Sequence, residues 1–402
     1  MRVENLPDEF ITALPILTTI TNAGYEAYFV GGSVRDTLLG KPIHDVDIAT
    51  SAYPAEIKAL FKKTVDTGIE HGTVMILDHG EGYETTTFRT ESGYTDFRRP
   101  DEVTFVRDLS EDLKRRDFTI NALAMRGNGE IVDLFAGLTD LQQGILRAVG
   151  DPKERFHEDA LRMMRAVRFS AQLGFTIEAN TQQAIKSEAH LLAKIAVERT
   201  NVEFSKLLLG KDAQRGLLEF AETGLYQYVP GVISEHELDI IAAATALENV
   251  RLTSDEQAWT FVVSQLGLDE AATMAFLKAW KHSNDLIKTV TNANRFIRTY
   301  KAQAVVTNWD LYSVGADLSI ALSVLQITQV DFPVDQLQQA YAALPIKDKH
   351  ELAISGQDLI KRGVVKPGPM MGKVLAQLEQ GVVAGEMVNE PAALLAQAAK
   401  II

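Results

Sequence analysis

Residues 29–50 read FVGGSVRDTLLGKPIHDVDIAT, a stretch that joins a glycine turn to a pair of acids in an apolar setting. The apolar run over 26–30 predicts a strand, and 34–39 predicts a helix. Between them, Gly31 and Gly32 let backbone N–H groups converge without a Cβ in the way, and the start of the helix adds a partial positive charge. Such a turn suits a triphosphate, with Arg35 as a further counter-charge, although an ordinary strand-to-helix turn has the same sequence.

Asp45 and Asp47 lie on the strand predicted over 45–49. Because strand residues two apart point to the same side, both carboxylates should share one face. Their neighbours are apolar, and two carboxylates on a half-buried face are unfavourable unless they are paired or bind a cation. Oxygen ligands suit Mg²⁺, which keeps water and substrate phosphate as its other ligands. The sequence therefore predicts a magnesium site, with Glu84 as the expected third carboxylate; the alternative is a polar strand edge that faces solvent.

The composition is that of a globular protein. The chain has 402 residues, of which 46% are hydrophobic, and no cysteine, so disulfides and thiolate metal sites are excluded. Residues 1–10 lack the basic-then-apolar pattern of a signal peptide, and no apolar run approaches the ~18 residues of a membrane span. We therefore expect a cytoplasmic protein that binds no membrane. The net charge of −14 argues against a nucleic-acid partner, but the segment 107–168 is neutral and its arginines cluster, which leaves a basic groove for RNA open.

The pattern of apolar residues changes near residue 150. Before it we expect a helix over 14–23, with Pro15 in its first turn, and paired strands over 73–78 and 83–89. The polar, arginine-containing segment 91–101 predicts a loop. Beyond residue 150, amphipathic helices are expected to the C-terminus, beginning with 154–174, 179–192, 196–209 and 212–223.

Several segments resemble one known family. Residues 30–50 resemble the first motif of the nucleotidyltransferase superfamily that includes DNA polymerase β, and more closely that of the bacterial class II tRNA nucleotidyltransferases, the CCA-adding enzymes. RRDFTINALAM (115–125) resembles the second motif, EDALRMMRAVRF (158–169) the amino-acid template motif, and VERTNVEFSKLL (197–208) the neck helix that follows it. The segments similar to the family's tail are ELAISGQDLI (351–360) and MGKVLAQLEQGVVAGEMVNE (371–390).

The resemblance implies an α+β fold, in which a polymerase β-like head with a mixed sheet precedes an elongated all-α neck, body and tail. The implied ranges are 1–150 for the head, 151–210 for the neck, 211–290 for the body and 291–402 for the tail. The implied activity is the template-independent addition and repair of the 3′-terminal CCA of tRNA from CTP and ATP, in the order C, C, A, by two-metal transfer with release of pyrophosphate. The implied macromolecular partner is the acceptor–TΨC half of tRNA, and a homodimer is left open.

The template motif offers a chemical route to base selection. As part of one helix over 158–169, Asp159 and Arg162 are neighbours. Asp159 can accept a hydrogen bond from the amino group that cytosine and adenine share, and Arg162 can donate to the adjacent ring nitrogen; guanine and uracil present the reverse pattern. The alternative is a solvated helix face with Glu158–Arg162 and Asp159–Arg162 ion pairs.

The resemblance assigns further residues. Arg116, in a helix expected to start at 115–118, is poised for the nucleotide, although it also fits an exposed basic pair. Glu158 supports the template pair, and the loop over 90–101 serves the final A step. Arg165 and Arg168 match positions that contact the nucleotide or its phosphates. The residues predicted to hold the tRNA backbone, each of which also fits a solubilising helix surface, are Lys361, Arg362, Lys366 and Lys373.

Three other functions share parts of this pattern. A bacterial poly(A) polymerase has the same head and neck motifs, but the stretch 61–66, which reads FKKTVD, lacks the basic Gly-Arg-Arg-Phe-like segment typical of those enzymes. An inactive RNA-binding protein on the same scaffold would not need intact Asp45, Asp47 and Arg162. A small-molecule nucleotidyltransferase would not need the long helical body.

Overall fold

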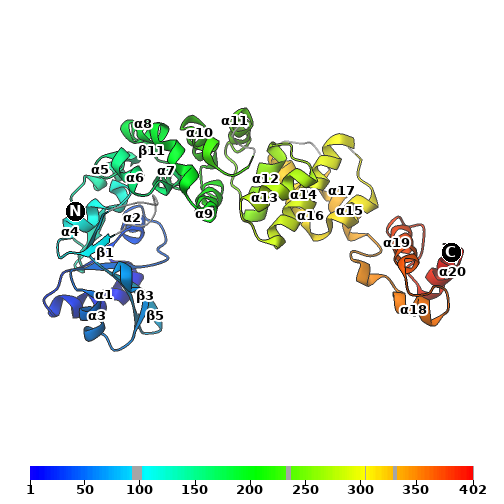
Figure 1. The fold of residues 1–402 in the computed structure, drawn as a ribbon, viewed down its shortest axis with the longest axis horizontal. Coiled ribbons are helices and arrows are strands. Elements are labelled where there is room, and N and C mark those ends of the chain that lie inside the picture. The colour runs from blue at the N-terminus through cyan, green and yellow to red at the C-terminus, as the bar shows by residue number, and fades with distance from the viewer. Residues whose placement is uncertain (93–101, 232–236, 304, 329–332, 402) are drawn as a thin grey trace. The chain divides into compact units, whose positions relative to one another are not determined.

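The computed structural model describes residues 1–92, 102–231, 237–303, 305–328 and 333–401, so the loop predicted over 91–101 lies almost entirely outside the described residues. The chain divides into two compact units, Met1–Ala244 and Thr245–Ile402 (Figure 1). The first unit contains the sheet and the second is helical. The α+β fold with a mixed sheet followed by helices is therefore confirmed.

The first unit is built on a seven-stranded sheet in the order β3-β4-β5-β2-β1-β8-β9. The pairing of β2 with β5 is parallel and the other pairings are antiparallel. The predicted hairpin is present as β4 and β5, with a short turn at His79 and Gly80. The strand bounds are β1 Ala27–Val30, β2 Asp47–Thr50, β3 Thr64–Gly68, β4 Thr73–Asp78, β5 Glu81–Thr87, β8 Leu123–Met125 and β9 Ile131–Asp133.

Strand β1 is buried on both faces and lies between two apolar clusters. On one face Phe29 packs with residues of α1 (Asp8–Asn22), such as Phe10 and Ile16. On the other face Tyr28 packs with Phe88 and Leu113. This packing on both faces holds the end of β1, from which the glycine turn continues into α2.

Helix α1 begins earlier than predicted. It starts at Asp8, directly after Pro7, and Pro15 lies inside it instead of in its first turn. The buried stripe Phe10, Ala13 and Ile16 continues across the proline. The tertiary burial of this stripe outweighs the hydrogen bond that an internal proline removes, which together with its steric clash costs about 3 kcal/mol or more.

The segment after the hairpin contains a small second sheet and a short helix. Strand β6 (Arg89–Ser92) pairs antiparallel with β7 (Glu102–Phe105), and α4 (Leu109–Lys114) follows. Asp108 caps α4 by accepting a hydrogen bond from the Ser110 N–H. The prediction that a helix starts at 115–118 is wrong, because these residues follow the helix that Asp108 starts.

The rest of the first unit is mostly helical, as predicted. Helix α7 carries the buried residues Met163, Met164 and Val167 and packs against both α9 and α10. The α9–α10 turn and α10 both approach α7 closely, since a Cβ at Gly210 of the turn or at Gly216 of α10 would lie 2.8 or 2.7 Å from Ala171. The helices here are α2 Gly32–Leu38, α3 Pro54–Leu60, α5 Gly137–Gln143, α6 Pro152–Glu158, α7 Leu161–Leu173, α8 Ala179–Glu188, α9 Val197–Leu208 and α10 Ala213–Glu222, and a short parallel pair joins β10 (Ile145–Leu146) to β11 (Thr176–Ile177).

The second unit has two apolar cores. One forms around α14, which contacts α12, α13 and α16 and encloses Trp259 and Trp280. The other joins the C-terminal helices through Val374, Leu378 and Leu394. The helices are α12 Asp255–Gln265, α13 Glu270–Ala279, α14 Asn284–Gln303, α15 Asn308–Val314, α16 Leu318–Ile327, α17 Val334–Ala342, α18 Gly356–Lys361, α19 Pro369–Val383 and α20 Pro391–Ile401, and α11 Glu237–Ala246 spans the division between the units.

One stretch of the second unit, Asn308–Ile327, is long and apolar enough to span a membrane by length and composition only. Gly315, at φ 58°, separates α15 from α16 inside it, and α16 packs against α12 and α14. The expectation that no apolar run approaches the length of a membrane span is wrong for this stretch.

Candidate active site

A cavity of about 780 Å³ lies in the first unit, where the glycine turn, the start of β2, the segment after α4 and the helices α7 and α9 meet. Its charged lining contains more basic than acidic side chains, which suits a polyanionic ligand. Glu84 and Glu158 do not line it. The lining residues are Gly31, Gly32, Arg35, Asp45, Asp47, Arg115, Arg116, Asp117, Asn121, Asp159, Arg162, Arg165, Arg168, Phe169, Gln172 and Lys206.

The glycine turn closes one side of the cavity. Gly31 has φ 75°, in the region that favours glycine, and a Cβ there would lie 3.3 Å from Arg116 Nη1 and 3.7 Å from Asp47 Oδ2. Arg35 is buried and donates hydrogen bonds to Asp36 (2.9 Å) and to Asn121 (2.7 Å). These hydrogen bonds hold the Arg35 side chain at the cavity wall, where the charge of Asp36 partly offsets that of the guanidinium.

Only one of the two acids lies on a strand. Asp47 is the first residue of β2, whereas Asp45 lies in the irregular segment before it, so the predicted strand over 45–49 is wrong at its start. The segment leaves the sheet here because β1, the partner of β2, ends at Val30, which is paired with Asp47. Both acids nevertheless line the cavity.

Glu84 lies beside Asp47. The parallel register pairs Ile48 with Thr85, which places Glu84 and Asp47 on adjacent strands. The Asp47 side chain reaches solvent, but the protein groups around it still partly desolvate its carboxylate. This desolvation and the negative charges of Glu84 and Asp45 raise the pKa of Asp47, whereas the positive charge of Arg116 lowers it. A concentration of negative charge that raises a carboxyl pKa is also one that attracts a cation.

The donor set fits a hard divalent cation. Among the described residues, no three carboxylate or histidine groups converge as a ready-made metal site. Asp45 and Asp47 both line the cavity and are the residues that would hold such a cation, with water and substrate oxygens as its other ligands.

Two buried acids that the sequence analysis did not single out organise the arginines after α4. Asp112 accepts hydrogen bonds from Arg115 (2.8 Å) and Arg116 (3.2 Å). Asp117 accepts hydrogen bonds from Arg165 (2.8 Å) and Asn121 (3.0 Å). Burial disfavours ionisation of Asp117, but Arg165 and the hydrogen bonds outweigh it and hold the pKa of Asp117 well below its ordinary value.

The template motif is not one helix. α6 ends at Glu158 and α7 begins at Leu161, with Asp159 in an extended conformation between them (φ −139°, ψ 102°), so the predicted continuous helix is wrong. The Asp159 carboxylate accepts a hydrogen bond from the N–H of Leu161, the first residue of α7 (3.0 Å). This bond from a side chain to the backbone competes with the helical backbone bonds that would have joined the two segments.

Asp159 and Arg162 both line the cavity but have separate partners. Arg162 Nη1 donates to Glu158 (2.6 Å), and Nη2 donates to the Arg115 carbonyl (2.7 Å). Asp159 instead pairs with Arg199 of α9, at 2.8 Å from Oδ2 to Nη2. The Glu158–Arg162 ion pair is thus present as the alternative interpretation expected, while Asp159 pairs with another helix.

The remaining arginines gather around one ring. The guanidinium groups of Arg35, Arg165 and Arg168 lie 5.1, 5.2 and 4.0 Å from the centre of the Phe169 ring. Arg168 also pairs with Glu203 of α9 at 2.7 Å, and burial lowers the pKa of Arg168 to about 10. Helical spacing alone did not reveal that Phe169 contacts these arginines or that Glu203 pairs with Arg168. In the sequence, Phe169 resembles an ordinary core aromatic residue and Glu203 an ordinary surface acid.

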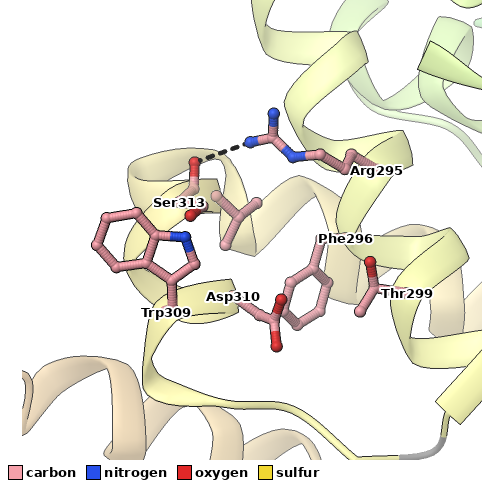
Figure 2. A pocket seen from close by; sticks show the side chains of 7 residues that line it. Arg295, Phe296, Thr299, Trp309, Asp310 and Ser313 are labelled. Atoms are coloured by element: carbon pink, nitrogen blue, oxygen red, sulfur yellow. Dashed lines mark hydrogen bonds between the residues drawn. The ribbon is translucent and has the colours of Figure 1, made fainter. Parts of the chain in front are cut away.

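A second cavity, of about 300 Å³, lies between α14 and α15 of the second unit and is shown in Figure 2. Its charged groups are engaged internally: Arg295 donates to the Ser313 carbonyl, and Asp310 caps α15 by accepting from Thr307. Trp309 lies at its edge, against Tyr312. The cavity of the first unit, with its array of acids and arginines, is therefore the candidate active site.

The four basic residues predicted to contact tRNA lie in the second unit, around the end of α18 and the start of α19. All four are exposed. None of them lines the candidate active site, whose lining lies wholly in the first unit.

Comparisons with known proteins agree on one family. A model described as the poly(A) polymerase head domain matches residues 27–147, one described as a probable RNA- and SrmB-binding site of polymerase A matches 174–235, and one described as tRNA nucleotidyltransferase domain 2 matches 250–398. The CCA-adding enzyme of Lactiplantibacillus plantarum is 59% identical over 98% of this chain and 97% of its own length. That of Levilactobacillus brevis is 55% identical over 98% and 99%. The crystal structure of the Bacillus stearothermophilus CCA-adding enzyme in complex with CTP matches with a TM-score of 0.87 and 42% identity, over 98% of both chains.

Proposed function

This chain belongs to the family of CCA-adding enzymes, and we propose that the cavity of its first unit is where C, C and A are added to the 3′ end of tRNA from CTP and ATP. One observation carries this assignment. A single cavity contains both the acid pair Asp45 and Asp47 and the base-reading pair Asp159 and Arg162, which lie more than a hundred residues apart in the sequence. Transfer and base selection therefore take place in one site.

Asp45 and Asp47 are the proposed ligands of Mg²⁺. When bound there, Mg²⁺ supplies activation of the tRNA 3′-hydroxyl and neutralisation of the charge on the departing pyrophosphate. In the reaction the 3′-oxygen bonds to the α-phosphorus, the bond to the β-phosphate oxygen breaks, and pyrophosphate leaves. Glu84 contributes negative charge beside Asp47 and thereby strengthens cation binding.

Asp159 and Arg162 select the base. Asp159 accepts a hydrogen bond from the amino group of cytosine or adenine, and Arg162 donates to the neighbouring ring nitrogen. Guanine and uracil would leave both residues mispaired, at a cost of ~1–3 kcal/mol for each buried polar group. The separate partners of the two side chains support this role, since neither is neutralised by the other.

The other cavity residues position the phosphates and sugar. Gly31, Gly32 and Arg35 are assigned to the β- and γ-phosphates, and Arg116 lies beside the glycine turn, near enough to Asp47 to affect its pKa. Arg165 and Arg168 are assigned to the sugar-phosphate, with Glu158 as the support of Arg162. The proposed contacts to the tRNA backbone are Lys361, Arg362, Lys366 and Lys373, and the proposed compartment is the cytoplasm, where tRNA, CTP and ATP meet.

The decisive experiment incubates tRNA that lacks its 3′ end with each labelled nucleoside triphosphate and Mg²⁺. We expect two C residues and one A residue to be added in order, after which addition stops. The Asp45→Ala variant should add nothing while it still binds tRNA. A long A tail would support a poly(A) polymerase instead, and no addition by the unaltered protein would indicate a binding protein.

A further inference from the structure

One cation of the active-site lining differs from all the others. The lining arginines each form an ion pair with a carboxylate of the protein, and they are Arg35, Arg115, Arg116, Arg162, Arg165 and Arg168. Lys206 of α9 also lines the cavity, but no carboxylate among the described residues pairs with it. A lining cation whose charge the protein does not offset suits an anionic ligand.

The place of Lys206 in the cavity follows from the direction of α9. Asp159, just before α7, pairs with Arg199 in the first turn of α9. Arg168, in the second half of α7, pairs with Glu203, further along α9. The two helices therefore run in the same direction along the cavity. Lys206 comes nearly one turn after Glu203, so it lies towards the C-terminal end of α7, away from Asp159.

Gln172, in the last turn of α7, lines the same end of the cavity, and its side chain makes no hydrogen bond to another described residue. A rise of 1.5 Å per residue places Gln172 about 15 Å along the helix axis from Arg162. This is about the reach of an extended nucleoside triphosphate from its base to its terminal phosphate. Arg35, which is assigned to the β- and γ-phosphates, meets α7 at Phe169, one turn before Gln172. A nucleotide whose base contacts Arg162 therefore has its terminal phosphate near Gln172 and Lys206.

Two further lysines lie beyond this end of the cavity. Lys211, in the turn between α9 and α10, reaches the end of α7, since a Cβ at Gly174 would lie 3.3 Å from its Nζ. Lys41 follows α2, and its burial lowers its pKa. Asp36 opposes this shift, whereas the positive charges of Lys211 and Arg35 add to it. Neither lysine forms an ion pair with another described residue, so positive charge continues from the cavity towards solvent.

We propose that Lys206 and Gln172 bind the terminal phosphate of the nucleotide and hold the pyrophosphate after transfer. Lys41 and Lys211 extend this site towards solvent and guide the pyrophosphate as it leaves. Lys206 donates a charge-assisted hydrogen bond, and because its side chain is exposed, the anion held there stays in contact with solvent, as a departing product must. This inference rests on the proposed function, since the base-reading pair defines the other end of the ligand.

The test measures binding by isothermal titration calorimetry with two probes, pyrophosphate and CMP, each in the presence of Mg²⁺. Lys206→Gln should raise the Kd of pyrophosphate about five- to tenfold, the range for one charge-assisted hydrogen bond that is open to solvent. CMP has the base, the sugar and one phosphate but no terminal phosphate, so its Kd should stay unchanged. Lys206→Arg, which keeps the charge, should retain most of the affinity for pyrophosphate. In addition assays, the pyrophosphate concentration that halves CTP incorporation should rise in Lys206→Gln by the same factor.

A matched control is Lys186→Gln on α8. Lys186 pairs with Glu222 at 2.9 Å and does not line the cavity, so this variant should bind both probes as the unaltered enzyme does. Equal weakening of CMP and pyrophosphate in Lys206→Gln would overturn the inference, because it would indicate a general change in the cavity. Unchanged pyrophosphate binding with weaker tRNA binding would overturn it too and would assign Lys206 to the RNA backbone. In both cases ordered C, C, A addition by the unaltered enzyme would leave the proposed function intact, whereas failure of that addition would refute the proposed function itself.

Discussion

At the scale of single residues, the acids of the active site are in two opposite electrostatic states. Asp47 lies among other carboxylates, and its pKa is raised by burial and by Glu84. Asp117 is buried among cationic and amide donors, and its pKa is lowered. The first state suits an acid that awaits a cation, and the second suits an acid that holds arginines in place. Each state predicts a different pH dependence.

For Asp47 we expect Asp47→Asn to abolish nucleotide addition and to stabilise the metal-free protein. A raised carboxyl pKa means that the ionised form destabilises the fold, and that this destabilisation appears as the pH rises through the raised pKa. Because the side chain reaches solvent, the effect is small: Tm of the first unit should rise by about 1–3 °C at about pH 8 and not at about pH 4. Thermal unfolding without Mg²⁺ measures this. A lower Tm for the variant at both pH values would contradict it.

For Asp117 we expect the reverse. Asp117→Asn removes the charge that pairs with Arg165, and the first unit should lose about 3 kcal/mol of unfolding free energy at neutral pH. A lowered carboxyl pKa gives stability that is present above the ordinary aspartate pKa and is lost only as the pH falls through the lowered one. The difference from the unaltered protein should therefore persist at about pH 5, as measured by urea denaturation.

The control for Asp117 is Asp66→Asn, which removes an exposed ion pair with Lys58 (2.9 Å) on the same unit. Its effect should stay below about 1 kcal/mol. Equal losses in the two variants would show that burial of Asp117 adds nothing to its role.

At the scale of elements, the active site depends on how closely α7, α9 and α10 pack. Gly216 of α10 faces α7 and α9, where a Cβ would lie 2.7 Å from Ala171 and 2.9 Å from Leu207. Arg199 and Glu203 approach the active-site residues only because α9 lies against α7. A change in this packing should therefore alter the positions of Asp159 and Arg162, the proposed base-reading pair.

Two glycines in helices allow a matched comparison. Gly216→Ala should destabilise the first unit by about 1–3 kcal/mol, because overpacking outweighs the better helix propensity of alanine. A Cβ at Gly372 of α19 would meet no neighbouring atom within 4 Å among the described residues, so Gly372→Ala should stabilise the second unit by about 0.5–1 kcal/mol. Urea denaturation, with the transition of each unit followed separately, measures both changes in unfolding free energy and shows whether each is a loss or a gain. A gain in stability from both substitutions would show that α10 can move away from α7 freely.

At the scale of the full chain, an acidic protein must bind an acidic partner. The net charge is −14, so contacts with tRNA depend on local basic residues, and their affinity falls with salt. Replacing Lys361, Arg362, Lys366 and Lys373 together by Gln should weaken tRNA binding and reduce the salt dependence by about one unit of slope for each phosphate that is no longer bound. The rate at saturating tRNA should not change, because these residues lie outside the active-site cavity.

Filter binding over a range of salt concentrations measures this prediction. Lys58→Gln is the control, since Lys58 is already paired with Asp66 on the first unit. Unchanged affinity and slope in the four-residue variant would assign these side chains to solubility alone.

Local patterns were enough to predict the glycine turn, the hairpin of β4 and β5, the buried methionines of α7 and the candidate pairs Asp45–Asp47 and Asp159–Arg162. Each of these features depends on near neighbours in sequence: a turn needs glycine, a hairpin needs alternating residues around a short turn, and a motif has a fixed spacing. The family resemblance joined them into one site. Arg165 and Arg168 were predicted only from that resemblance.

The sequence alone could not predict which acid pairs with which arginine. The pairs are Asp117 with Arg165, Asp159 with Arg199 and Glu203 with Arg168. Each joins side chains that are distant in the sequence, and periodicity says nothing about which acid meets which arginine. The passage of α1 across Pro15 has the same origin, since a local preference gave way to core burial. The break at Asp159 is local instead, because its side chain accepts a hydrogen bond from the Leu161 N–H, two residues on. Long-range packing chooses among locally allowed conformations, because the free energy of burial and pairing exceeds the small differences between them.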